Sequence, residues 1–379
     1  MAGSLRPRRG VAAVRGGTVT RPRTGDTAGL ERELRAALEG EVRFDAYARA
    51  MYSTDAGIYR MEPIGVVTPK SADDVAATVE IAFRRGVPVL PRGAGTSQPG
   101  QSVNHAVVID FPTHLHSIIE VNPEERWVLT EPGITIDELN RQLRPHGLYF
   151  AIDPSTSNRA NVGGAIGNNS SGSRSIVYGL TVDHVLEMSA VLSDGTQVRL
   201  RPLSTSQLEA GIGGGLEGEI YRRVREICTL HRQEVERRFP KLLRHVGGYN
   251  LDLLSDPHVV DLTKLVVGSE GTLAVVTAAR LNVEPVPRHR GLAVLHFNGI
   301  TEALEATMTV LKESPSAVEH AGSMVLREAR RALGPSDGVD FLQGEPEDIL
   351  IVEFFGESEA EVAARLDRLE QRMVRARQG

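Results

Sequence analysis

The sequence is nearly free of cysteine and has no long hydrophobic run. Among its 379 residues Cys228 is the single cysteine, which excludes an internal disulfide and a cysteine-held iron–sulfur cluster within this chain. No run approaches the roughly 18 apolar residues that are needed to cross a bilayer, so we expect no membrane span. The formal net charge is −6, and no basic stripe with interleaved aromatic residues appears. We therefore expect no nucleic-acid partner.

Acidic residues are missing from the first 25 residues, which hold many arginines. Arg8-Arg9 is the one feature shared with an export signal, but no apolar stretch follows that could form the core of a signal peptide. The composition predicts a disordered basic leader over residues 1–26. In the absence of an export signal we expect a cytoplasmic protein.

The most distinctive stretch is the glycine-rich segment 91–101, PRGAGTSQPGQ, which directly follows the apolar run 87–90. Its glycines allow successive backbone N–H groups to turn toward one point. Such a row of amides forms an anion-binding nest that suits a diphosphate.

The residues after this segment separate several cofactor folds. In a Rossmann site the glycines open a helix, but here Pro99 and Gly100 lead straight into a predicted strand over 106–111. No glycine is followed by Lys and then Ser or Thr in the manner of a P-loop. We therefore predict a diphosphate-binding loop between two strands of a small α+β lobe.

A second segment, 153–172, reads DPSTSNRANVGGAIGNNSSG. A disordered linker is one interpretation of so many small polar residues. Interleaved apolar residues such as Val162 and Ile166 favour an ordered wall instead, because small residues let a flat ligand lie against the backbone. The hydroxyl and amide side chains would then donate hydrogen bonds to that ligand.

The remaining pattern predicts an α+β protein with two domains. A hairpin is expected over 117–130 and a T-x-x-E capping box starts a helix at Thr135. A charged helical insert is expected at about 202–260 and a domain boundary after Pro287. Residues 289–379 then alternate strand and helix, ending on a charged helix with no closing strand. From that ending we expect a truncated chain.

Four blocks in this order resemble the FAD-binding domain of the vanillyl-alcohol-oxidase, or PCMH-type, flavoprotein superfamily. They are PRGAGTS at 91–97, the segment 153–172 with Tyr178-Gly179 and Asp183-His184-Val185 after it, GGYNLDLL at 247–254, and GSEGTLAVVT at 268–277. The nearest branch contains the D-lactate, glycolate and D-2-hydroxyglutarate dehydrogenases. The resemblance implies a two-lobed FAD-binding domain over 27–288 and the start of a ferredoxin-like α+β substrate cap over 289–379.

The resemblance also implies which residues contact the cofactor. The first glycine loop would wrap the FAD diphosphate, the second segment would line the isoalloxazine and ribityl part, and the later residues would complete the pocket. The implied cofactor-binding residues are Pro91, Arg92, Gly93, Ala94, Gly95, Thr96, Ser97, Gln98, Pro154, Ser155, Thr156, Ser157, Asn161, Gly163, Gly164, Gly167, Asn168, Ser171, Gly172, Tyr178, Gly179, Asp183, Val185, Glu270, Gly271 and Val276.

Non-covalent FAD is expected, because covalent members of the superfamily place a histidine in or just after the first glycine loop. This loop has Thr96 and Ser97, and His105 stands at the next strand. No metal is expected: His114 and His116 have a possible metal spacing but no acidic or third ligand nearby. Catalytic residues remain unassigned, since those of similar dehydrogenases come from a later part of the cap.

The implied activity is hydride removal from the α-carbon of a small D-2-hydroxy acid, which gives a 2-oxo acid. Longer relatives continue into an iron–sulfur domain, so the electron acceptor is expected to be such a domain or subunit outside this chain. A non-catalytic FAD-binding subunit that works with a partner chain is the alternative function. An unrelated nucleotide-binding α+β protein is a third.

Overall fold

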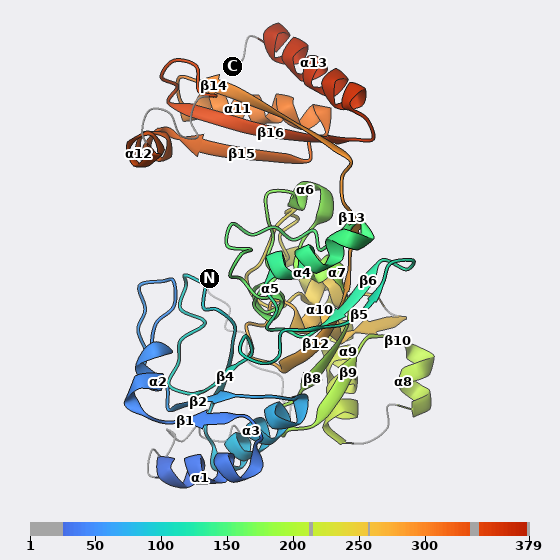
Figure 1. Cartoon of the computed structure of the whole chain (residues 1–379). Coiled ribbons are helices and arrows are strands. Elements are labelled where there is room, and N and C mark those ends of the chain that lie inside the picture. The colour runs from blue at the N-terminus through green and yellow to red at the C-terminus, as the bar shows by residue number, and fades with distance from the viewer. Residues whose placement is uncertain (1–25, 212–214, 257, 334–340, 377–379) are drawn as a thin grey trace, which may run out of the picture.

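The computed structural model describes residues 26–211, 215–256, 258–333 and 341–376. All of the predicted leader except Asp26 therefore lies outside the described residues. The chain folds into two lobes with a separate α+β unit above them (Figure 1), and this unit is named the cap below. The mixture of helices and sheets confirms the predicted α+β class.

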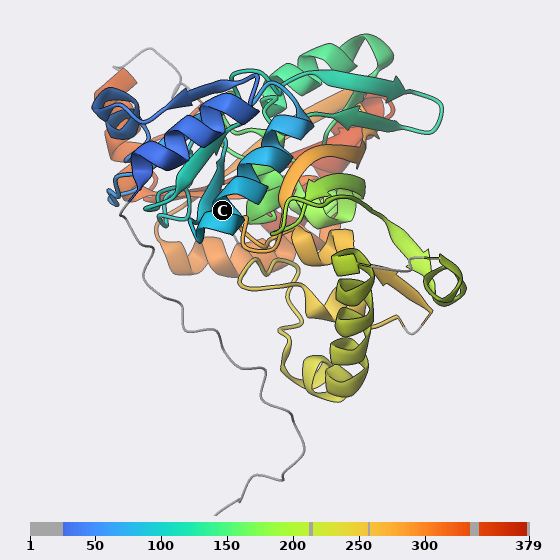
Figure 2. The same ribbon diagram turned by 90° about the horizontal axis from the view of Figure 1, so that it is seen from below.

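The first lobe is a four-stranded sheet in the order β1-β2-β4-β3. Strands β2, β4 and β3 are parallel and β1 is antiparallel to β2. The elements of this lobe are α1 (Thr27–Ala37), β1 (Glu41–Arg43), α2 (Ala46–Met51), β2 (Gly65–Thr68), α3 (Ala72–Arg85), β3 (Val89–Arg92) and β4 (Val107–Asp110). Figure 2 shows α1 and α3 side by side on one face of the sheet.

Helix α3 shows how the local sequence determines where an element of this lobe begins and ends. The Ser71 hydroxyl accepts a hydrogen bond from the Asp74 amide, and Gly86 ends the helix with φ +64°, a conformation that glycine adopts without strain. The spacing of Val75, Val79 and Phe83 predicts one buried face; Val75 and Val79 are buried, whereas Phe83, near the end of the helix, is exposed. The chain is thereby returned to β3, which feeds the glycine loop.

The second lobe is a five-stranded sheet in the order β5-β6-β12-β8-β9. Its strands pair antiparallel throughout, and the predicted hairpin over 117–130 is confirmed. The strands are β5 (Ile118–Asn122), β6 (Trp127–Thr130), β8 (Val185–Val191), β9 (Gln197–Leu200) and β12 (Val275–Asn282). The largest apolar core lies between this sheet and its helices.

Short helices cover one side of the second sheet. Helix α4 begins after Thr135, whose hydroxyl accepts from the Glu138 amide as the capping box predicts. The remaining short elements are α4 (Ile136–Leu143), η1 (Arg144–His146), β7 (Leu148–Tyr149), α5 (Val162–Asn168), α6 (Ser175–Tyr178), α7 (Thr181–His184), α10 (Leu262–Val266) and β13 (Glu284–Pro285).

The predicted helical insert at about 202–260 is not purely helical. A two-stranded antiparallel sheet joins its first and last residues, β10 with β11. Between these strands the long helix α9 projects away from the two sheets (Figure 2). The insert consists of β10 (Pro202–Ser204), α8 (Thr205–Gly211), α9 (Gly215–Arg238), η2 (Leu251–Leu254) and β11 (Val259–Asp261).

The cap is a three-stranded antiparallel sheet in the order β14-β16-β15. Its last strand is therefore central, and helices α11 and α13 pack on one face around Leu350, Val352 and Phe354. The cap elements are β14 (His289–Phe297), α11 (Ile300–Val310), η3 (Leu311–Glu313), β15 (Ala317–Gly322), α12 (Ser323–Leu333), β16 (Asp348–Gly356) and α13 (Glu359–Ala376). Across the described ranges, no helix combines the length and the apolar character that a bilayer crossing requires.

Candidate cofactor site

A cavity lies where the loop after β3 faces helix α5 and the turn before β12. It gathers three segments that are far apart in the sequence. The first of them, the glycine loop, joins strand β3 to strand β4 without a helix between them, as the sequence predicts. The predicted residues that line it are Pro91, Arg92, Gly93, Ala94, Gly95, Thr96, Ser97, Pro154, Thr156, Asn161, Gly163, Gly164, Gly167, Asn168, Glu270, Gly271 and Val276.

The glycine loop presents unpaired amides to this cavity. Gly95 has φ +69°, in the left-handed region that glycine adopts without strain. The amides of Gly95, Thr96 and Ser97 have no acceptor among the residues that the structure describes. Three successive N–H groups without partners on a cavity wall are what an anion-binding nest requires.

Arg92 holds this loop in place through hydrogen bonds to the backbone of neighbouring segments. Its guanidinium donates hydrogen bonds to the backbone carbonyls of Tyr52 (3.0 Å), Ser102 (2.8 Å) and Thr54 (2.7 Å). The carbon at its centre lies 5.4 Å from the centroid of the Tyr52 ring, and burial lowers the pKa of Arg92. Because these N–H groups are already used, Arg92 positions the loop, and its direct contribution to an anion is smaller than its sequence position suggests.

The segment around Tyr52 is held in turn by carboxylates. The Tyr52 hydroxyl donates to Asp110 at 2.8 Å, and burial is the main cause that raises the pKa of Tyr52. Asp55 accepts a hydrogen bond from the Ser102 hydroxyl at 3.0 Å, and the Ala56 amide donates to the Gly95 carbonyl. Residues 52–56 therefore support the glycine loop, a role that sequence reasoning missed.

Asn161 joins the two lobes at the cavity. Its side-chain oxygen accepts from the Ala94 amide at 2.7 Å, and its side-chain nitrogen donates to the Gly133 carbonyl at 2.5 Å. The side chain is buried, and a Cβ on Gly93 would lie only 2.7 Å from its oxygen. Close approach of the loop to Asn161 thus requires glycine at position 93.

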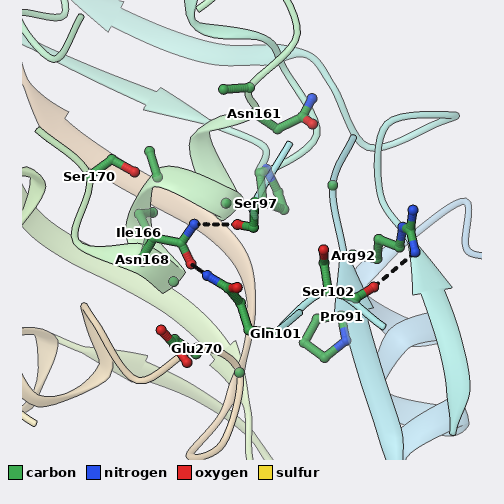
Figure 3. A pocket seen from close by; sticks show the side chains of 18 of the residues that line it. Pro91, Arg92, Ser97, Gln101, Ser102, Asn161, Ile166, Asn168, Ser170 and Glu270 are labelled. Carbon is green, nitrogen blue, oxygen red and sulfur yellow. Dashed lines mark hydrogen bonds between the residues drawn. The ribbon is translucent and has the colours of Figure 1, made fainter. Parts of the chain in front are cut away.

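A second connection joins the far end of the loop to helix α5. The Asn168 amide nitrogen donates to the Ser97 hydroxyl at 2.7 Å, and Gln101 donates to the Asn168 oxygen at 3.2 Å. Figure 3 shows these bonds on one side of the cavity, with the Arg92–Ser102 bond on the other. The loop is therefore fixed at both of its ends.

The wall formed by α5 is a helix that follows the N-cap residue Asn161, whereas the sequence predicted an ordered wall without indicating its secondary structure. Val162, Ala165 and Ile166 are buried in the core of the second lobe, so packing outweighs the low helix propensity of three glycines. Gly164 lines the cavity with no atom within 4 Å of where a Cβ would stand. This bare backbone lets a flat ligand lie against the wall.

The turn before β12 completes the cavity. The Gly268 amide donates to the Ile166 carbonyl and the Glu270 amide to the Gly167 carbonyl, so the turn is docked on α5. Glu270 has φ +53° and Gly271 φ +75°. A non-glycine residue with positive φ is uncommon and typical of functional turns.

Several predicted site residues lie outside this cavity. The Asp183 carboxylate accepts from the Leu180 amide at 2.8 Å, Val185 is buried in the core, and the Tyr178 ring faces the cap residue Phe355 at 6.3 Å between centroids. These positions shape the surroundings of the cavity and do not line it. The full set outside is Gln98, Ser155, Ser157, Ser171, Gly172, Tyr178, Gly179, Asp183 and Val185.

Other lining residues were not predicted. Most of them are apolar or directly follow a predicted residue, and no sequence signal marks them. Gln101 and Ser102 are polar and lie close to the loop in the sequence, so their hydrogen bonds could have been inferred. The additional lining residues are Gln101, Ser102, Phe111, Pro132, Ala160, Ala165, Ile166, Ser170, Val266, Ser269 and Ala274.

The family described as "FAD binding domain" matches residues 63–201, which hold both the glycine loop and α5. The chain carries an FAD-binding domain of the PCMH-type flavoprotein superfamily. FAD is accordingly its cofactor, and the cavity fits it: unpaired amides suit a diphosphate and the Gly164 wall suits a flat ring.

Curated relatives agree with this assignment. The chain is 37% identical over 354 residues to D-2-hydroxyglutarate dehydrogenase of Pseudomonas putida, covering 91% of this chain and 35% of that protein. It is 28% identical over 276 residues to glycolate oxidase subunit GlcD of Bacillus subtilis, covering 72% of this chain and 48% of that subunit. The chain thus spans about a third of the length of the D-2-hydroxyglutarate dehydrogenases that it matches.

A solved structure supports the fold. Alkyldihydroxyacetonephosphate synthase superposes with a TM-score of 0.66 at 18% identity, covering 92% of this chain and 59% of that one. At this identity the likeness bears on architecture alone, and it includes the cap as well as both lobes.

Proposed function

We propose that this chain binds FAD non-covalently in the cavity and acts in the oxidation of a small D-2-hydroxy acid to a 2-oxo acid. The observation that carries the proposal is the cavity itself, in which three unpaired amides and a bare glycine wall meet within an FAD-binding domain. The relatives' printed names supply the substrate class. Bound FAD supplies the hydride acceptor for this chemistry.

The residues of the chain have binding and positioning roles in this proposal. The amides of Gly95, Thr96 and Ser97 bind the diphosphate, and Arg92 and Asn161 hold the loop that carries them. The Gly164 wall and the turn at Glu270 and Gly271 exclude water from the flat part of the cofactor. None of these side chains is proposed as the base that takes the substrate hydroxyl proton.

Non-covalent attachment rests on the residues of the loop. Thr96 and Ser97 stand where a histidine would be needed, and neither side chain is a usual site of flavin attachment. His105 is exposed, with its Nδ1 3.0 Å from the Glu62 carbonyl. It does not line the cavity.

The proposal includes no metal ion. His114 and His116 remain a possible pair by spacing alone, and within the described ranges no three His, Cys, Asp or Glu side chains gather as a candidate metal site. The electron acceptor is proposed to be an iron–sulfur domain or subunit outside this chain, and the location to be cytoplasmic.

A dye-reduction assay tests whether the catalytic groups lie within this chain or whether the chain works only with a further part, as in the alternative of a non-catalytic FAD-binding subunit. The purified 379-residue chain, loaded with FAD, would be given D-lactate or D-2-hydroxyglutarate and an artificial electron acceptor. We expect poor turnover, because no base or substrate-carboxylate site is assigned within it. Robust turnover would overturn that expectation and place the catalytic groups inside the chain. Absence of any FAD binding would overturn the whole proposal and favour an unrelated nucleotide-binding protein.

A further inference from the structure

The boundary between the cap and the FAD-binding lobes holds a partly buried ion-pair cluster of Asp153, Arg174 and Glu353. Arg174 lies in the loop between α5 and α6, and its guanidinium donates two hydrogen bonds to Glu353 at 2.8 and 3.0 Å. It donates a third to Asp153 at 3.1 Å. Arg288, in the segment between β13 and β14, also pairs with Glu357 of the cap at 3.6 Å, but both of those side chains are exposed.

Glu353 is a charged residue in a buried position of the cap, which costs free energy unless the charge is paired. It stands on the central strand β16, on the face away from the core formed by Val352 and Phe354, and only 9% of its side chain is exposed. A buried carboxylate needs a close cation and hydrogen bonds. Arg174 supplies both, and its hydrogen bonds to Glu353 are the main cause that raises the pKa of Arg174.

Aromatic contacts enclose the same cluster. The guanidinium carbon of Arg174 lies 5.6 Å from the centroid of the Phe355 ring. Phe355 also faces Tyr178, which meets Tyr149 edge-on at 5.9 Å. These rings reduce the access of water to the ion pairs, and the pairs are stronger for that reason. The cap rests here on α6, while the chain crosses to it on one side through β13 and β14 (Figure 1).

Asp153 connects the cluster to the cofactor cavity. It directly precedes Pro154, and Pro154 and Thr156 line the cavity. Its carboxylate also accepts from the Ser173 hydroxyl at 2.9 Å, and a Cβ on Gly172 would collide with it at 1.8 Å. A movement of the cavity wall at residues 153–156 would therefore displace Asp153, which is a hydrogen-bond partner of Arg174.

The charges argue against a direct substrate role for Arg174. One guanidinium faces two carboxylates, so its positive charge is already balanced, and Arg290 lies 4.0 Å from Glu353 on the other side. A substrate carboxylate would have to displace an acid that the fold buries. The cluster joins parts of the protein and is not a vacant anion site.

We propose that Arg174 is a positioning residue that docks the cap sheet onto the wall of the FAD cavity, through Glu353 on the cap and Asp153 on the wall. The coupling to the cofactor rests on the proposed function, whereas the docking itself does not. FAD that contacts the 153–156 wall then steadies the cap, and a docked cap in turn steadies the wall.

Hydrogen–deuterium exchange of the whole chain tests this, with and without added FAD. In Arg174→Ala we expect exchange of segments 172–178 and 286–291 to rise at least about tenfold, because a buried carboxylate loses its partner. Exchange over residues 292–297 of β14, which pair with β16 further from the boundary, should stay unchanged, since the cap has its own core. Glu353→Gln should behave similarly, and Arg174→Lys should fall between, because lysine cannot make the paired contact.

A matched control is Arg141→Ala, which removes an exposed arginine bonded to Glu138. Exchange in Arg174→Ala that equals this control at both segments would overturn the docking role. If a single variant unfolds, the double variant Arg174→Gln with Glu353→Gln removes both charges and should recover the fold while keeping the faster exchange. Recovered protection at both segments would contradict the proposal.

Added FAD distinguishes the two proposals. In the wild type, FAD should slow exchange at 93–97, 161–168 and also 172–178; in Arg174→Ala it should slow only the first two. Slowing at 172–178 that persists in Arg174→Ala would overturn the coupling. No effect of FAD on any segment would contradict the proposed function, while the comparison without FAD still decides whether Arg174 docks the cap.

Discussion

The wall between the two lobes and the boundary with the cap are built in different ways. At the cofactor cavity, the glycine loop is held by many short contacts to backbone groups, through Arg92, Asn161 and Asn168. At the cap boundary, one ion-pair cluster and a group of aromatic rings connect two independent cores. The first arrangement fixes a loop in one conformation, whereas the second joins two separately packed cores by a few contacts.

This difference indicates that the cavity is the part built for binding and that the cap boundary is the part built for movement. A site that must present several amides to one anion gains from being rigid before the ligand arrives. Under the proposed function, a cap that admits and releases a small substrate needs few contacts that can break together. Substitutions at the cavity should therefore weaken cofactor binding, and substitutions at the boundary should loosen the cap with a smaller effect on FAD.

The largest effect is expected from Gly95→Val. Valine would be forced to φ +69°, and its Cβ would lie 2.6 Å from the Arg92 guanidinium. The resulting strain and displaced amides should raise the Kd for FAD at least about 100-fold. The measurement is FAD titration by quenching of flavin fluorescence.

The control for this variant is Gly247→Val, where no atom lies within 4 Å of the added Cβ and φ is not positive. Unchanged FAD affinity in Gly95→Val would show that the glycine loop is not the diphosphate site. In the absence of FAD, hydrogen–deuterium exchange of the cap should be unaffected by either substitution, because neither position touches the cap boundary.

Much of the cavity could be predicted from sequence because its signals are local. Gly93 and Gly95 after a strand indicate a nest, and Gly164 and Gly167 indicate a bare wall. The helix over 162–168 could not be predicted with confidence from its glycines, since buried contacts of Val162 and Ile166 with the second lobe decide it. Local propensity does not include such tertiary packing.

Contacts to backbone groups also could not be predicted from the sequence. Arg92 binds carbonyl oxygens of Tyr52 and Thr54, and every residue type supplies a carbonyl, so no sequence pattern marks these partners. Arg174 and Glu353 are 179 positions apart. Nothing in either segment indicates the other, because their meeting depends on how the cap is placed on α6.

The second largest effect is expected from Asn161→Ala. The change leaves the Ala94 amide and the Gly133 carbonyl without their buried partner, which should lower the free energy of unfolding by about 2–4 kcal/mol. FAD affinity should fall as well, because the loop loses its link to the second lobe. Urea unfolding with and without FAD measures both effects.

Asn158→Ala is the neighbouring control, since that side chain is exposed. Equal stability of the two variants would mean that the link through Asn161 contributes little. It would also remove the contrast between a firmly held cavity and a loosely held cap.

A smaller effect is expected from Arg92→Lys. Lysine keeps the charge but cannot reach three carbonyls in the fixed geometry of a guanidinium. The Kd for FAD should rise about tenfold, corresponding to roughly 1.4 kcal/mol. Arg84→Lys, at an exposed ion pair, should leave it unchanged. A normal Kd in Arg92→Lys would show that the support from residues 52–56 does not shape the site.

The central claim is that the cavity holds FAD without a covalent bond. The most direct measurement is to equilibrate the purified chain with FAD, remove the excess, record the flavin absorbance, and then precipitate the protein with acid. We predict about one flavin per chain before acid treatment and all of it in the supernatant afterwards. No flavin on the protein would contradict binding, and flavin that stays with the precipitate would contradict non-covalent attachment.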